Sequence, residues 1–234
     1  MSLSLPTRWL PRLTTLLAAA SFSVSVMALS LSDLSQGDAT SALRSALTQG
    51  AEMAVDSLGK TDGFMGNPEV RIELPSDLGK AAKMMKTFGM GSEVSALELS
   101  MNRAAEAAVP QARQLLIDAV KNMSVSDAKG ILTGGNTAGT EYLNRSSREQ
   151  LRSRFLPIVK QATDQVGLAQ QYNTFAGQAA SFGVIDAQSA NLESYVTEQA
   201  LDGLFTLIGA EEQKIRQNPA EAAGSLAKKV FELL

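Results

Sequence analysis

The chain has 234 residues, a formal net charge of −3 at pH 7, and neither cysteine nor histidine. Without these two residue types it has no disulfides, no thiol chemistry, no histidine-based catalytic triads, and none of the usual zinc or di-iron ligand sets. The slight excess of acidic residues also argues against a nucleic-acid partner, which requires a basic face.

Residues 1–28 have the pattern of a cleavable export signal. Arg8 and Arg12 precede an apolar stretch, and small residues stand before the expected cleavage after Ala28. Cleavage would leave residues 29–234 and change the net charge from −3 to −5, because the two arginines are the charged residues removed. No cysteine stands near the cleavage point, so we expect a periplasmic protein that is not a lipoprotein; an uncleaved membrane anchor is the alternative.

Apolar residues recur at spacings of three and four along most of residues 29–234, which is typical of amphipathic helices. No apolar stretch after the signal approaches the roughly 20 residues of a membrane-spanning helix. We therefore expect a single all-α domain, a bundle of about eight helices. The expected ranges are 43–58, 76–88, 92–122, 124–133, 137–144, 147–166, 168–182, 191–217 and 220–234. Pro110 is expected to kink or split the third of these helices, because proline removes a main-chain hydrogen bond.

One segment, about residues 66–75, departs from the helical pattern. Apolar residues at positions 70, 72 and 74 alternate with charged residues at positions 69, 71 and 73, which is the period of an extended chain. The flanking Pro68 and Pro75 disfavour a regular sheet. We predict a short extended strap that lies across helices.

Without cysteine and histidine, carboxylates are the main candidates for a functional site. Asp202 lies in the stretch 201–208, which is apolar almost all round a helix, so we expect it to be buried and paired. Asn102, Arg103 and Glu106 neighbour one another on another helix. We predict that these four residues form a buried polar cluster or a ligand-binding site, with Arg103 paired to Asp202. The alternatives are a purely structural ion pair for Asp202 and a surface pair between Arg103 and Glu106.

Two further acids, Glu211 and Glu212, are secondary candidates. Together they could bind a cation, whereas the alternative is a solvated helix face on which Glu212 pairs with Arg216 one turn later. We predict neither a resident metal nor a cofactor, and assign no catalytic residue.

Five segments in order resemble the bacterial family called domain of unknown function 4197. They are GFMGNPEVRIELP (63–75), NRAAEAAVPQA (102–112), DAKGILTGG (127–135), YVTEQALDGLF (195–205) and AEEQKIRQNPA (210–220). Thr140-Glu141-Tyr142 fits the following family block, so Tyr142 is a further candidate. The resemblance implies an exported envelope protein of a Gram-negative bacterium, and many members resemble lipoproteins, from which this chain departs because it lacks cysteine.

Three functions stay open at this point. The first is a non-catalytic binding or envelope-associated module for a small amphipathic ligand or a protein partner. The second is a carboxylate-based hydrolase of cell-envelope glycan, in which Asp202 would act with Glu106 or Glu211. The third is a structural or assembly protein whose C-terminal amphipathic helix docks on a partner through Leu226 and Phe231. The oligomeric state is not predicted.

Overall fold

The structure is a computed structural model that describes residues 36–75, 87, 89, 91–164, 173, 191–221 and 224–231. The expected signal at 1–28 lies outside the described residues. The expected helix at 76–88 lies outside them except for residue 87, and the helix at 168–182 except for residue 173.

The described residues are helical and contain no strand, which confirms the helical class. The α-helices are α1 (Gln36–Leu58), α3 (Gly91–Ala108), α4 (Ala112–Lys121), α5 (Val125–Leu132), α6 (Ala138–Thr163), α8 (Leu192–Gln217) and α9 (Ser225–Phe231), with 3₁₀ turns η2 (Val109–Gln111) and η3 (Pro219–Glu221). Within the described part, five helices have ten residues or more, which is fewer than the eight or so expected.

One reason for this difference is that the two helices expected at 137–144 and 147–166 form one continuous helix, α6. Serines at the expected break do not cap a new helix. The hydroxyls of Ser146 and Ser147 donate instead to the carbonyl of Leu143, within the same helix. Pro110, by contrast, splits the expected helix 92–122 as predicted, because it lies in the 3₁₀ turn between α3 and α4.

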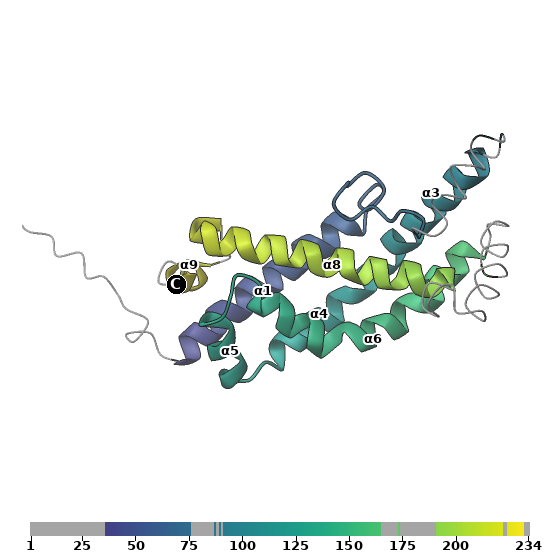
Figure 1. Cartoon of the computed structure of the whole chain (residues 1–234). Coiled ribbons are helices and arrows are strands. Elements are labelled where there is room, and N and C mark those ends of the chain that lie inside the picture. Colours follow the sequence, from purple (N-terminus) through teal and green to yellow (C-terminus); the bar gives the residue numbers. More distant parts are fainter. Residues whose placement is uncertain are drawn as a thin grey trace, which may run out of the picture.

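Helix α8 is the central element of the packing, since it contacts α1, α3 and α6 (Figure 1). The main core is one continuous cluster of buried apolar side chains that draws on every long helix. Alanines line much of α3 and its junction with α4, and Ala104, Ala108 and Ala112 are fully buried. These small side chains let the helices approach closely, so that the core of this chain without disulfides is tightly packed.

The strap lies against this core as an irregular extended segment. Val70 and Ile72 are buried whereas Glu69, Arg71 and Glu73 are exposed, so the predicted alternation is confirmed. Residues 71–75 have no regular secondary structure, in keeping with the two flanking prolines.

Helix α9 packs on α1, and its apolar side is covered within the chain. Ala227, Val230 and Phe231 are buried, whereas the side chain of Leu226 lies outside the described residues. Phe231, through which this helix was expected to dock on a partner, is thus buried within the chain. Among the described residues, no helix is both long enough and apolar enough to cross a membrane.

Candidate functional site

Asn102 on α3 holds the strap by its main chain. The side-chain Oδ1 accepts a hydrogen bond from the N–H of Ile72 (2.9 Å), and Nδ2 donates to the carbonyl of the same residue (2.8 Å). Nδ2 also donates to the carbonyl of Glu98 (2.8 Å), and the side chain is fully buried. Asn102 thus acts as a neighbouring strand would, which explains how an extended segment is stabilised without a sheet.

Glu106, one turn further along α3, binds the start of the same segment. Its Oε1 accepts from the N–H groups of Phe64 (3.1 Å) and Met65 (3.2 Å), and its Oε2 accepts from Arg103 Nη1 (2.6 Å). Arg103 Nη2 also donates to Asp62 (2.7 Å), and the hydrogen bonds to Glu106 and Asp62 raise the pKa of the guanidinium. We call Asn102, Arg103 and Glu106, with the segment 62–75 that they hold, the strap clamp.

The predicted pair between Arg103 and Asp202 is wrong, as is the predicted burial of Asp202. The Asp202 side chain is 56% exposed and accepts a hydrogen bond from Arg148 on α6 (2.7 Å). Thr206, one turn later, is also exposed and donates to the carbonyl of Asp202. These two residues form a polar stripe on the solvent side of α8. The prediction missed it because the stretch 201–208 is apolar at most of its positions.

The strap lies against α8 beside this stripe. A Cβ built on Gly203 would lie 2.7 Å from the Phe64 ring, so the strap and α8 need a glycine here to come this close. The hydroxyl of Tyr195 donates to the carbonyl of Glu73 (3.0 Å). The strap is thus bound by its main chain from both α3 and α8.

The acids proposed for a hydrolase are each in contact with a cation. Glu106 accepts from Arg103 (2.6 Å), Asp202 from Arg148 (2.7 Å) and Glu211 from Lys214 (2.6 Å). Paired carboxylates of this kind stabilise structure, because the cation holds the charged form and occupies its lone pairs.

Glu212 is buried, although the alternative interpretation placed it on a solvated helix face. Its carboxylate accepts from the N–H of Gly139 (3.0 Å), and from both the N–H and the hydroxyl of Thr140 (2.7 Å each). The hydroxyl of the N-cap residue, Thr137, bonds Glu141 instead of the main chain. Glu212 therefore caps α6 from α8, and its charge is favourable at the helix N-terminus.

Arg216 completes this junction, and its predicted pair with Glu212 is confirmed. Arg216 donates to Glu212 (2.9 Å) and to the carbonyl of Ile131 at the end of α5 (3.0 Å), and its guanidinium lies 5.7 Å from the centre of the Phe231 ring. We call Glu212, Arg216 and these partners the helix-end junction, because it joins α5, α6, α8 and α9. Among the described residues, no group of three or more acidic side chains could hold a metal ion.

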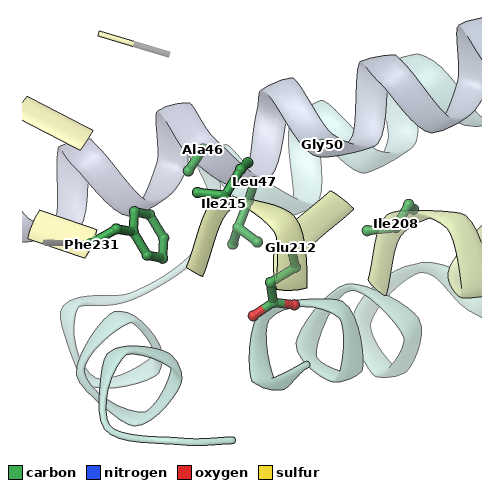
Figure 2. Close-up of a pocket in the computed structure, with 7 residues that line it drawn as sticks. All are labelled: Ala46, Leu47, Gly50, Ile208, Glu212, Ile215 and Phe231. Carbon is green, nitrogen blue, oxygen red and sulfur yellow. The ribbon is translucent and has the colours of Figure 1, made fainter. Parts of the chain in front are cut away.

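Figure 2 shows the space beside this junction, where Glu212 points away from α1. The cavity has a volume of about 10 Å³, which is room for about one water molecule. Its lining residues are Ala46, Leu47, Gly50, Ile208, Glu212, Ile215 and Phe231. A ligand larger than water does not fit here.

Tyr142, the remaining candidate, ties α6 to α4. Its hydroxyl donates to the carbonyl of Ala119 (3.2 Å). Burial raises the pKa of this phenol, and the nearby charge of Asp127 acts in the same direction. A tyrosine with a raised pKa stays protonated and remains a hydrogen-bond donor at neutral pH.

Two larger hollows lie at the surface, and sequence reasoning missed both. One has a volume of about 490 Å³ and is lined by Leu156, Lys160, Asp164, Asn173, Asn191, Glu193 and Ser194. The other has a volume of about 470 Å³ and is lined by Arg44, Ser45, Thr48, Gln49, Glu52, Val120 and Lys121. Both volumes fall in the range of small-molecule sites. The second hollow is lined by residues about 70 positions apart in the chain. No local sequence pattern predicts that such distant residues lie side by side.

Comparison with known proteins gives one match. No curated protein and no solved structure matches the chain. The family described as protein of unknown function (DUF4197) matches residues 33–232. Since this match covers most of the sequence, the chain belongs to the DUF4197 family.

Proposed function

We propose that this protein is exported to the periplasm and acts there as a non-catalytic binding module for a small amphipathic ligand or an envelope partner. The proposal depends on one observation: the buried polar candidates are already engaged in contacts within the fold, whereas the larger hollows lie at the surface. The strap clamp and the helix-end junction occupy the buried candidate residues, whereas the roomy hollows open at the surface. Binding at the surface is therefore the activity that this arrangement favours.

Native mass spectrometry of the protein purified from a periplasmic fraction tests this proposal. We expect a fraction of the protein to carry additional mass, which is lost on denaturation and identifies the ligand or partner. If protein purified from the periplasmic fraction carries no bound species in any preparation, the proposed binding function is contradicted.

Export is tested separately, by cell fractionation and N-terminal sequencing. The proposal predicts a periplasmic chain that begins at Leu29, because cleavage is expected after Ala28. The absence of cysteine supports release without a lipid anchor. A chain that keeps residues 1–28 and sediments with membranes would favour the uncleaved anchor.

Hydrolysis of envelope glycan has less support, because it requires one acid that can donate a proton and a second that stays free to act. The three acids considered for this role are each paired with arginine or lysine. A Glu106→Gln variant tests the alternative against purified envelope glycan. Loss of a measurable hydrolytic activity in a folded variant would restore the hydrolase hypothesis.

A further inference from the structure

The surface hollow between α1 and α4, which we call the α1–α4 cleft, carries a charge that the fold leaves without a counter-ion. Helix α1 supplies Arg44, Thr48 and Glu52, each one turn apart, and α4 supplies Val120 and Lys121 near its C-terminal end. The two helices pack directly against each other (Figure 1).

Six of the nine described arginines lie within 3.9 Å of a carboxylate oxygen: Arg71, Arg103, Arg113, Arg148, Arg152 and Arg216. Arg44 is one of the three described arginines without such a contact, and of these three it is the one that lines a surface hollow. Arg44 donates through Nη2 to the carbonyl of Met123, and within the described part of the chain its buried Nε has no acceptor.

The register of the two helices places both cations at one end of the cleft. Arg44 contacts Met123, and Asp56, later in α1, contacts Arg113, at the start of α4, so the helices run antiparallel. Lys121, two residues before Met123, therefore lies at the Arg44 end. Glu52 is eight residues further along α1, about 12 Å at 1.5 Å per residue.

The acid nearest to Lys121 holds it only weakly. Asp118 lies 4.0 Å from Lys121 Nζ, and the Lys121 side chain is 68% exposed. The C-terminus of α4 also carries a negative partial charge of about half a unit, which accounts for the position of Arg44 beside Met123. It does not account for a second cation and an open cleft of about 470 Å³ at the same place.

We propose that the α1–α4 cleft binds the carboxylate end of a small amphipathic acid, with Arg44 as the principal donor and Lys121 as the second cation. This inference rests on the proposed binding function and gives its ligand class. The guanidinium is held in place by Met123, and a planar carboxylate is the group that it pairs with best. The hydroxyl of Thr48 offers a further donor, and Val120 offers apolar contact.

An NMR titration of the ¹⁵N-labelled full chain with hexanoate tests this proposal, with hexan-1-ol as the uncharged probe of equal chain length. We expect hexanoate to shift the side-chain Nε–H signal of Arg44 and the amide signals around Thr48 and Lys121. Hexan-1-ol should bind at least about tenfold more weakly, because it cannot form the charge-assisted hydrogen bonds.

Matched variants assign the effect to named side chains. Arg44→Gln should weaken hexanoate binding at least about tenfold, whereas Arg113→Gln, the same change on an α4 arginine outside the cleft, should leave it unchanged. Arg44→Lys keeps the charge and should lose less than Arg44→Gln. Glu52→Gln should tighten binding about twofold, since it removes a negative charge about 12 Å away. A purely structural role of Arg44 predicts no effect of the Glu52 change.

Several results would overturn the inference. These are equal binding of hexanoate and hexan-1-ol, no saturable binding of hexanoate, or the same loss in Arg44→Gln and Arg113→Gln. If Arg44→Gln does not fold, Arg44→Lys and Glu52→Gln decide the question. The proposed function stands or falls separately, because native mass spectrometry of the periplasmic protein would still reveal a ligand of another class.

Discussion

Replacing Glu212 by glutamine removes the charge that holds the helix-end junction while almost preserving the shape of the side chain. Glu212 is 4% exposed and accepts hydrogen bonds from Gly139, Thr140 and Arg216. The Arg216 side chain is itself only 9% exposed, so it would lose its carboxylate where water cannot replace it. Breaking one side of a buried pair costs about 3–5 kcal/mol, and we expect Glu212→Gln to lower the free energy of unfolding by that amount.

Urea denaturation of the full chain, followed by circular dichroism, measures this loss. An m-value equal to that of the unchanged protein indicates that both unfold by the same two-state transition. The neighbouring Glu211→Gln is the matched control, because Glu211 pairs with Lys214, whose side chain is 59% exposed. We expect that change to cost less than about 1 kcal/mol. A Glu212→Gln loss below about 1 kcal/mol, or one equal to the control, would refute the assignment of Glu212 as the cap of α6.

Four further predictions follow from the packing and the ion pairs. Asn102→Ala leaves the Ile72 N–H and C=O unpaired, so hydrogen exchange at the strap should accelerate and stability should fall by about 2–3 kcal/mol; native exchange rates at Ile72 would contradict this. Gly203→Ala places a Cβ 2.7 Å from Phe64 and should cost about 1–3 kcal/mol in a melting experiment, whereas Gly130→Ala, with open space around it in α5, should be neutral or stabilising. Asp202→Asn should change the free energy of unfolding by less than about 1 kcal/mol in urea, because that side chain is exposed; a larger loss would restore its predicted buried role. Burial raises the pKa of Glu198, but hydrogen bonds from Arg152 and Arg148 outweigh this effect, so the pKa is lowered below 4.5. The stability that this shift contributes is present above pH 4.5 and is lost as the pH falls through the lowered pKa. The free energy of unfolding, measured between pH 6 and pH 3, should therefore depend less on pH in Glu198→Gln.

Features that depend on neighbouring residues in the chain could be predicted from the sequence. The helix expected at 124–133 is present as α5, and its start is fixed locally by a capping box between Ser124 and Asp127, which lie within one helical turn. The alternation in the strap is present for the same reason, since a side chain two positions along points to the same side. Pro110 splits the expected helix because it lacks the N–H that a helix interior needs at this position.

Features that depend on the meeting of distant elements could not be predicted. Glu212 bonds main-chain groups more than 70 residues away, and an acidic pair on a helix looks the same whether it faces water or another helix end. Asp202 shows the converse error, because a mostly apolar window does not say which narrow side of the helix stays in water. The glycine at position 139 is the sequence feature that reflects this close approach. A Cβ there would lie 2.4 Å from Leu47 and 3.1 Å from the Glu212 carboxylate.

The strap clamp and the helix-end junction support the proposal that binding occurs at the surface. A chain without disulfides must fix its irregular connections by other means, and here Asn102, Glu106 and Glu212 do so by binding main-chain groups. Each of these side chains is buried and engaged, so a ligand could use it only by displacing the strap or the start of α6, at a cost of several kcal/mol. Arg44 donates to a main-chain carbonyl, not to an acid, and it borders a cleft that is already open. A ligand that brings its own carboxylate would therefore gain binding energy at Arg44 without disrupting the fold.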